Sequence, residues 1–270
     1  MRVLLLALVV STSACAKDQA AFAAGWKSEV LSPGLTWKQQ KFTDLYNSPQ
    51  VVNVLELDTT QHSIKFVTLE DSPLTVRQIG ETNKAIAAVN GTYFDINRMV
   101  STAFIKVDDR IVSRSHPHEP RQRAAIVIDG KGRIDLLRRP EGPGWDTPLP
   151  FPHILSASPM LVTHHKPWDH SGHEYGDERH PRTAAGLTDD QRLLLVTVDG
   201  RSKIASGMSY TELGETMSKL GCHTALCLDG GGSTTLWLRG KGVVNQPSDR
   251  SLLMRKSLER VMPSAIIIPE

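Results

Sequence analysis

An apolar run, a carboxylate and three consecutive glycines follow one another late in the sequence. Ala225–Leu228 is apolar, Asp229 comes directly after it, Gly230–Gly232 follow, and the apolar pattern resumes at Leu236. The flanking residues are typical of strands, which places the glycines at a strand end or in a tight bend. Glycine loses the most backbone entropy on folding, so three together are expected where the backbone takes positive φ or a ligand comes close.

The polar groups of this stretch suit an anionic or polyhydroxylated ligand. Asp229 would project at the mouth of a cleft, with backbone N–H groups and the hydroxyls of Ser233 and Thr234 beside it. The alternative is a glycine-rich hairpin in which Asp229 caps its own turn. Both interpretations stay open on this stretch alone.

Length and charge narrow the class of protein. The chain has 270 residues, of which 40% are hydrophobic and 22% charged, and its net charge is +2. This is the composition of a globular chain long enough for one large domain or two small ones. No run of lysine and arginine alternates with aromatic residues, so nothing supports nucleic acid as a partner.

The first residues predict an export signal. Arg2 supplies a positive charge, and Val3–Val10 form an apolar core too short to span a bilayer. Ser13-Ala14-Cys15 then resembles a bacterial lipoprotein box, which favours a signal over residues 1–15 with lipidation of Cys15. Cleavage before Lys17 by ordinary signal peptidase is the alternative.

These two cleavage modes lead to different locations. A lipoprotein would be periplasmic or on the outer membrane, contacting the membrane only through its N-terminal lipid, with residues 16–25 as a flexible tether. The alternative gives a secreted protein. The folded part is expected over residues 26–270.

Two further cysteines, Cys222 and Cys227, could pair in an exported protein. However, Cys222 is expected at the end of a helix and Cys227 in the middle of a buried strand, so the geometry of a disulfide is not assured. Two independent buried thiols are the favoured interpretation.

Hydrophobic periodicity and turn residues predict the secondary structure. Apolar and alternating runs predict strands, and turn signals join some of them into hairpins. The expected strands are 35–42, 51–57, 64–69, 85–89 and 157–162, the expected helix is 75–83, and the expected hairpins are 123–128 with 133–137 and 182–187 with 192–198.

A second helix is expected after Ser209. Ser209 and Glu212 have the spacing of a capping box, Leu213 and Met217 fall on one helical face, and Gly221 ends the helix. Many strands and few helices, without regular alternation, predict one α+β domain with a mixed β-sheet.

Two apolar strands end in Asp-Gly, at Asp199-Gly200 and at Asp229-Gly230. The helix between them would set the strands parallel, with both carboxyl ends at one edge, where ligand clefts form. Asp199, Arg201 and Asp229 would therefore meet there, joined by Asn90 if the strand over 85–89 is a neighbour. Glu212 has two interpretations, as a helix cap and as a catalytic acid, and its spacing favours the cap.

Five histidines occur between positions 164 and 180. Their spacing matches no zinc motif, so a solvated loop is favoured. His180 lies beside one of the sequence blocks described next.

Six blocks occur in order: A-V-N-G-T-Y-F-D, H-P-R-T-A-A-G-L, L-L-V-T-V-D-G-R, G-M-S-Y-T-E-L-G-E-T-M, L-D-G-G-G-S-T-T-L and V-V-N-Q-P-S-D. Together they resemble the phosphodiester glycosidase family, over Ala88 to about Ile268. Each block alone is a weak signal, whereas six in order are a strong one. Two departures concern the substrate side: the segment between Asn245 and Arg260 is unusually long, and Cys227 stands where the family often has Asn.

The resemblance implies an exported glycosidase that hydrolyses a sugar-1-phosphodiester, such as an α-N-acetylglucosamine-1-phosphodiester, to free sugar and a phosphomonoester. Its partner would be a glycan or sugar phosphate, no cofactor would be required, and Ca²⁺ could bind near the acids. The catalytic candidates are Asp229, Glu212 and Asp199. The substrate-binding candidates are Asn90, Gly91, Arg182, Thr183, Arg201, Gly230, Gly231, Gly232, Ser233, Thr234, Asn245 and Arg260.

The chemistry needs both kinds of charged residue. Glycoside hydrolysis through an oxocarbenium-like transition state usually uses two carboxyl groups. A phosphate leaving group is already acidic, so neutralising its charge matters more than a strong proton donor. Arginine supplies this through bidentate contact, and Arg182 and Arg201 are the candidates, with Arg260 third.

Two other functions fit part of the pattern. One is a metal-assisted phosphodiesterase acting on cell-envelope or exopolysaccharide glycans, with Asp199 and Asp229 as metal ligands. The other is a non-catalytic glycan-binding lipoprotein. Several carboxylates converging on one cleft are unusual for a pure binding module, which favours an enzyme.

Overall fold

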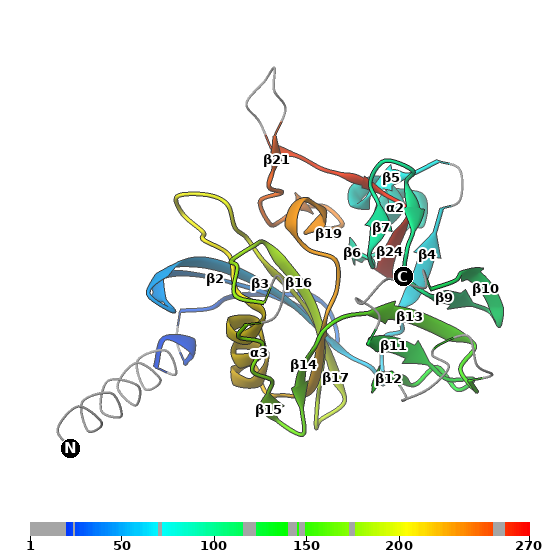
Figure 1. Cartoon of the computed structure of the whole chain (residues 1–270), viewed down its shortest axis with the longest axis horizontal. Coiled ribbons are helices and arrows are strands. Elements are labelled where there is room, and N and C mark those ends of the chain that lie inside the picture. The colour runs from blue at the N-terminus through cyan, green and yellow to red at the C-terminus, as the bar shows by residue number, and fades with distance from the viewer. Residues whose placement is uncertain are drawn as a thin grey trace.

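Three large β-sheets dominate the computed structural model (Figure 1), which describes residues 20–23, 25–69, 72–115, 123–139, 145, 149–172, 176–250 and 257–270. The largest sheet has eight strands. Their spatial order is β1 (Lys27–Ser32), β2 (Leu35–Leu45), β3 (Ser48–Asp58), β17 (Arg192–Val198), β16 (Arg182–Thr188), β18 (Cys222–Cys227), β14 (Met160–Thr163) and β15 (Lys166–Pro167).

Two five-stranded sheets complete the core. The first is ordered β10 (Arg110–Ser113), β9 (Ile105–Val107), β13 (His153–Ala157), β11 (Ala124–Ile128) and β12 (Ile134–Arg138). The second is ordered β20 (Gly242–Val243), β19 (Leu236–Leu238), β6 (Ala87–Asn90), β24 (Ser264–Ile268) and β4 (Lys65–Thr68).

Short strand pairs and helical segments lie around these sheets. The pairs are β21 (Asp249–Arg250) with β22 (Ser257–Leu258), β23 (Val261–Met262) with β5 (Leu74–Thr75), and β7 (Phe94–Asp95) with β8 (Val100–Ser101). The helical segments are α2 (Val76–Thr82), α3 (Tyr210–Lys219) and the 3₁₀ turn η2 (Gly231–Ser233).

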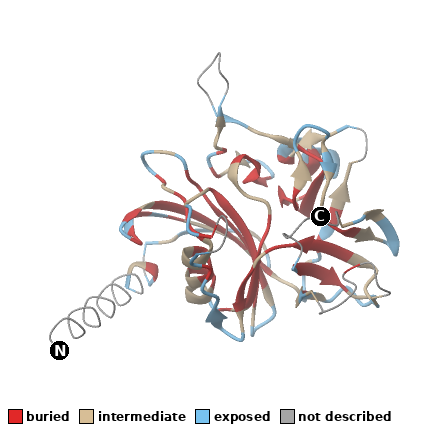
Figure 2. Cartoon of the chain, in the orientation of Figure 1, coloured by how far each residue is buried: buried red, intermediate tan, exposed pale blue. Residues whose placement is uncertain are grey.

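The eight-stranded sheet is buried on both faces. On one face, Leu213 and Met217 of α3 pack against strand residues such as Val196. On the other, residues such as Leu195 belong to a cluster shared with both five-stranded sheets, which includes Ile126. Figure 2 shows the buried residues concentrated along the strands where these layers meet. Because both faces are covered, the central strands are apolar runs without clean alternation.

Both predicted helices form where expected. Ser209 accepts a hydrogen bond from Glu212 N while the Glu212 side chain accepts one from Ser209 N, which completes the capping box of α3. Thr75 and Gln78 make the same reciprocal pair at the start of α2. The two predicted hairpins are confirmed as β11–β12 and β16–β17.

The prediction of a mixed sheet is wrong, because a mixed sheet contains parallel pairs of neighbouring strands. Every ladder between described strands is antiparallel, although β17 and β18 run in the same direction. The short turn after β16 makes β17 its hairpin partner. The crossover through α3 therefore brings β18 to the other side of β16, so β17 and β18 are not neighbours.

The single strand expected over 157–162 is also wrong. Its residues belong to two sheets, because β13 ends at Ala157 and β14 begins at Met160. Pro159 between them has no N–H to donate to a ladder, which favours a break at this point. The Pro159 carbonyl instead accepts a hydrogen bond from Cys227 N, at 2.9 Å.

The described part of the segment expected to be a tether, 20–23 and 25, includes residues that contact the fold. Phe22 is buried against Trp26 and Phe42, with ring centroids 6.1 and 5.1 Å away. Gln40 also donates a hydrogen bond to the Ala21 carbonyl, at 2.9 Å. Apolar contacts therefore hold these residues on the eight-stranded sheet. The signal over 1–15 and Cys15 lie outside the described residues.

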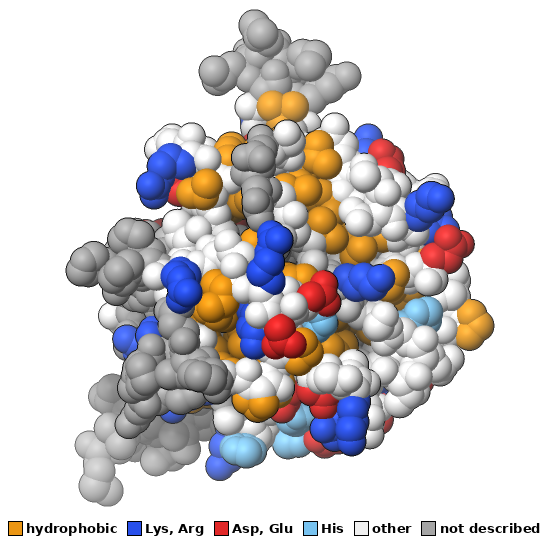
Figure 3. All heavy atoms as spheres, turned by 90° about the vertical axis from the view of Figure 1, so that its right-hand side faces the viewer, with side chains coloured by type: hydrophobic (Ala, Val, Ile, Leu, Met, Phe, Trp, Pro, Cys, Tyr) orange, Lys and Arg blue, Asp and Glu red, His pale blue; other side chains and the backbone are white. Residues whose placement is uncertain are grey.

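The described residues also bear on membrane insertion, surface charge and the two cysteines. Among them, no helix has both the length and the apolar content needed to cross a membrane. On the face shown in Figure 3, positive and negative side chains are interspersed with apolar ones. Cys222 and Cys227 are free and buried, which confirms two independent thiols.

The contact between β6 and β24 gives a test of the packing. A Cβ on Gly91, directly after β6, would lie 2.9 Å from the backbone carbonyl carbon of Ser264. We expect Gly91→Ala to lower the free energy of unfolding by about 1–3 kcal/mol, the usual cost of overpacking. Urea unfolding measures this. Gly130→Ala is the matched control, because nothing lies within 4 Å of the Cβ it adds; equal effects of the two changes would contradict the prediction.

Candidate active site

The carboxyl ends of β17 and β18 flank the start of β16. Arg182 pairs with Val198 at the end of β17, and Ala184 pairs with Cys227 at the end of β18. Asp199 and Asp229 directly follow these two ends. The predicted meeting of the two Asp-Gly segments at one edge is therefore what the topology produces.

The glycine segment connects two sheets and is not a hairpin. β18 pairs with β16 and β14, whereas β19 pairs with β6 and β20. Asp229 Oδ1 accepts a hydrogen bond from Gly230 N at 2.9 Å, which is the local cap, but the chain then leaves the first sheet. The hairpin interpretation is wrong.

At Gly231 and Gly230 the backbone requires glycine for two different reasons. Gly231 has φ of +62°, a conformation that a residue with a Cβ rarely adopts. Gly230 lies so close to the preceding segment that a Cβ there would be 2.8 Å from the Pro181 carbonyl oxygen. The same carbonyl accepts a hydrogen bond from Gly231 N, at 2.8 Å. The turn η2 is thus fixed against the start of β16.

Asn90 holds this junction together. Its Nδ2 donates to the Asp229 carbonyl at 2.7 Å, and its Oδ1 accepts from Thr183 Oγ1 at 2.8 Å and from Thr235 N at 3.2 Å. Asn90 and Thr183 are fully buried. Their hydrogen bonds position the glycine turn from behind.

Asn245 makes a second junction. Its side chain donates to the Thr234 carbonyl at 2.9 Å and accepts from Leu236 N at 2.7 Å. It also hydrogen-bonds the Asp199 carboxylate. Ser233 and Thr234, expected to lie beside the ligand, are buried under this junction.

Asp199 is buried at the edge of the sheet. Its Oδ1 accepts a hydrogen bond from Gln246 N, at 2.9 Å. Burial raises the pKa of its carboxyl group to about 6, against the opposing effect of the hydrogen bonds from Gln246 and Asn245. The group therefore titrates near neutral pH.

Asp229 is half-buried and more accessible than Asp199. Burial raises the pKa of the neighbouring Cys227 thiol to about 12; the charge of Asp229 acts in the same direction and that of Arg182 in the opposite one. With its pKa raised this far, the Cys227 thiol stays protonated at neutral pH and is unreactive.

Arg201 lies across the glycine turn. A Cβ on Gly231 would be 3.2 Å from Arg201 Nη2. The same nitrogen donates to His180 Nδ1 at 3.3 Å, and His180 Nε2 is 2.9 Å from Glu178 Oε2. Because Nδ1 accepts from arginine, Nε2 is assigned as the nitrogen that donates to Glu178. An exposed Arg–His–Glu chain therefore borders the turn.

The model of the phosphodiester glycosidase family matches residues 83–268 of the chain. The chain belongs to this family. The match includes β6, β16, β17, β18 and the glycine turn, so the junction described above lies inside the family domain.

Solved structures share the fold. The catalytic domain of zebrafish N-acetylglucosamine-1-phosphodiester α-N-acetylglucosaminidase, auto-inhibited by its pro-peptide, has a TM-score of 0.74 and 21% identity over 92% of this chain and 89% of that one. A hypothetical protein from Synechocystis has a TM-score of 0.65 and 14% identity, over 91% of this chain and 64% of that one. A putative exported protein from Burkholderia pseudomallei has 0.58 and 17%, over 82% and 74%.

One curated relative matches over a short segment. The SPbeta prophage-derived uncharacterized protein YomE of Bacillus subtilis is 40% identical over 67 residues, which are 25% of this chain and 10% of that protein. The chain therefore spans a small part of this relative's length.

Glu212 is held in two structural interactions. It completes the capping box of α3, and it receives Arg179 Nε on both oxygens, at 3.1 and 3.0 Å. Arg179 also donates to the Tyr46 carbonyl, at 2.6 Å. The carboxylate thus joins the helix to the β2–β3 turn.

The three candidate arginines have different surroundings. Arg182 is buried, stacks on Tyr210 with Cζ 3.9 Å from the ring centroid, and donates to the Met208 carbonyl at 2.8 Å. Arg260 makes a two-point pair with Asp249, at 2.8 and 3.0 Å, and the pair packs on Gly232. Arg201 is exposed and makes no ion pair with any described carboxylate.

Several residues of this region were missed by sequence reasoning. Arg179 and Glu178 precede the H-P-R-T block and carry no spacing signal of their own. His180 was assigned to a solvated loop, and only its position next to that block could have suggested a role. No group of three potential metal ligands from His, Cys, Asp and Glu occurs among the described residues; Ca²⁺ near the acids stays a prediction.

The raised pKa of Asp199 predicts a pH-dependent stability. Its folded-state pKa is above the ordinary value, so its contribution is fully present below about pH 4 and is lost as pH rises through about 6. The shift corresponds to a penalty on the order of 3 kcal/mol at neutral pH. Asp199→Asn keeps an acceptor for Gln246 N but removes the charge. We expect the free energy of unfolding of the variant, relative to the native chain, to rise between pH 4 and 7.5.

Urea unfolding across pH 3 to 7.5 measures this difference. Asp58→Asn is a control of opposite sign, because hydrogen bonds from Thr60 and Gln61 lower the pKa of that exposed carboxyl group. A pH-independent difference for Asp199→Asn would show that the carboxyl group titrates normally.

Proposed function

We propose that the protein hydrolyses a sugar-1-phosphodiester to the free sugar and a phosphomonoester. Family membership supports the class of reaction. The zebrafish enzyme of similar fold is named for removing α-N-acetylglucosamine from such a diester, which suggests the first substrate to test. The observation that carries the proposal is the placement of the accessible Asp229 beside a glycine turn that Arg201 crosses.

We assign the carboxylate chemistry first to Asp229. Of the three candidates, Asp199 is buried and Glu212 is held by Arg179, whereas Asp229 is partly exposed at the turn. Asp199 serves as the second carboxyl group or positions Gln246, and Glu212 positions the helix. Whether Asp229 attacks the anomeric carbon or activates water decides retention or inversion of configuration.

The reaction breaks the bond between the anomeric carbon and the phosphate oxygen. The bonding electrons remain on that oxygen, which yields a phosphomonoester. Water supplies the new anomeric hydroxyl group and releases one proton. Arg201 neutralises the charge that grows on the leaving phosphate, which is the larger need for a leaving group of this acidity.

Asp229→Asn tests the assignment. The change keeps size and most hydrogen bonds, so the variant should fold. We expect turnover of an α-N-acetylglucosamine-1-phosphodiester to fall about 10²–10⁴-fold, the scale of a lost general acid or base. Glu212→Gln is the comparison, for which we expect lower stability with most of the turnover retained.

The products discriminate between reaction classes. Hydrolysis in ¹⁸O-labelled water should place the label on the sugar; label on the phosphate would indicate a phosphodiesterase instead. Native turnover in Asp229→Asn would refute the role of this residue, and absence of turnover on any sugar phosphodiester would favour a glycan-binding protein.

We also propose that the enzyme acts outside the cytoplasm as a lipoprotein. The support is the charged start, the short apolar core and the small-residue segment ending at Cys15. Expression in a bacterial host followed by mass spectrometry should find an N-terminal lipidated Cys15. An unmodified N-terminus at Lys17 would show plain secretion, and an intact Met1 would refute export.

A further inference from the structure

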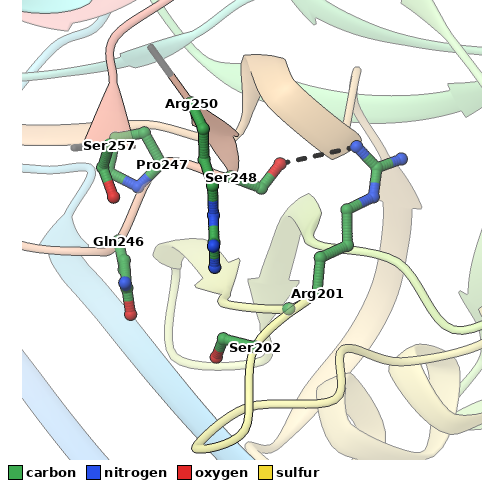
Figure 4. A pocket seen from close by; sticks show the side chains of 8 residues that line it. Arg201, Ser202, Gln246, Pro247, Ser248, Arg250 and Ser257 are labelled. Atoms are coloured by element: carbon green, nitrogen blue, oxygen red, sulfur yellow. Dashed lines mark hydrogen bonds between the residues drawn. The ribbon is translucent and has the colours of Figure 1, made fainter. Parts of the chain in front are cut away.

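A small polar pocket is lined in part by Arg201, the residue that also packs on Gly231 of the glycine turn (Figure 4). Its lining comes from the loop after β17 and from the segment that leads into β21 and β22: Gly200, Arg201, Ser202, Gln246, Pro247, Ser248, Arg250 and Ser257. Among the described residues, two arginines, three hydroxyl groups and an amide line it, and no carboxylate does. Such a lining suits an anion.

Arg250 is the residue of this pocket that sequence reasoning did not single out. It is exposed and, like Arg201, makes no ion pair with a described carboxylate. Neighbouring side chains of a strand point to opposite faces. Asp249 therefore faces Gly232, where Arg260 neutralises it, while Arg250 extends into the pocket (Figure 4).

The pocket wall is fixed by groups behind it. The Gln246 N–H is held by the buried Asp199 carboxylate at 2.9 Å, and Ser248 Oγ lies 3.5 Å from Arg201 Nη1. Gly200 is packed so closely that a Cβ there would lie 2.7 Å from Pro181 N. Arginine side chains at such a wall attract an anion, and a negative charge that reaches both would be stabilised by both.

We propose that this pocket binds the phosphate group of the substrate and of the product, with Arg250 and Arg201 as its two cationic contacts. The proposal rests on the proposed function and replaces Arg182, which is buried against Tyr210, by Arg250. The phosphomonoester product carries more negative charge than the diester at pH 7. The pocket therefore retains the product more tightly than it holds the substrate, and inorganic phosphate competes with both.

Binding of inorganic phosphate tests the pocket without turnover. Isothermal titration at pH 7.5 and low ionic strength should show binding to the native protein. Arg250→Gln and Arg201→Gln should each weaken it about 10-fold to 100-fold, the equivalent of one charged hydrogen bond. Arg133→Gln on the β11–β12 turn is the matched control, since it removes the same charge from an exposed arginine elsewhere.

Three results would overturn the proposal. They are no phosphate binding by the native protein, native affinity in Arg250→Gln, and an equal loss in Arg133→Gln, which would show general attraction only. Circular dichroism of each variant confirms that the fold is intact.

Inhibition kinetics test whether the pocket takes part in the reaction. With a sugar phosphodiester that is turned over, inorganic phosphate should inhibit competitively, and Arg250→Gln should relieve the inhibition while raising KM. Phosphate binding without competition would overturn the claim that the pocket holds the substrate's phosphate. If phosphate binds as predicted but no phosphodiester is cleaved, the proposed function fails and the anion site stands.

Discussion

The hydrogen bonds of one buried amide, Asn90, hold the candidate site in place. This side chain connects β6 of one sheet with β16 of another and with both ends of the glycine turn. Thr183 and Thr235 are fully buried and Asp229 is partly buried. Leaving a buried donor or acceptor unsatisfied costs about 1–3 kcal/mol. The position of Asp229 therefore depends on contacts made behind the turn, by residues that no ligand touches. Asn90, although it lies in a family motif, therefore positions the glycine turn through hydrogen bonds.

The three candidate carboxylates differ in burial and in hydrogen-bond partners, which the sequence alone does not reveal. Asp199 is buried and its pKa is raised to about 6, Glu212 is paired with Arg179, and Asp229 remains accessible. Carboxyl groups whose surroundings differ in this way can take different roles at one pH. The arginines also differ in their surroundings. Arg182 is buried against Tyr210, and Arg260 is paired with Asp249. Arg201 and Arg250 line the pocket.

Local patterns predicted the hairpins and both helices, because turn residues and capping boxes act over a few positions. The pairing of β18 with β16, and the division of residues 157–162 between two sheets, depend on contacts across the whole chain. The two strands that end in Asp-Gly, with a helix between them, predicted that Asp199 and Asp229 follow strand ends at one edge of the sheet, and the strand pairing agrees. The sequence blocks could not distinguish a buried Arg182 from an exposed Arg250, because the difference lies in the Met208 carbonyl and the Tyr210 ring that surround the first.

The second five-stranded sheet is completed by the C-terminal strand of the chain. β24, at residues 264–268, lies between β6 and β4, which precede it by well over a hundred positions. A nascent or proteolytically shortened chain that lacks β24 would leave both neighbours with unpaired edges and exposed apolar faces, a state prone to aggregation. Since Asn90 ends β6, the glycine turn would also lose its support. The support of the glycine turn and the closure of this sheet are thus completed in the same late step of synthesis.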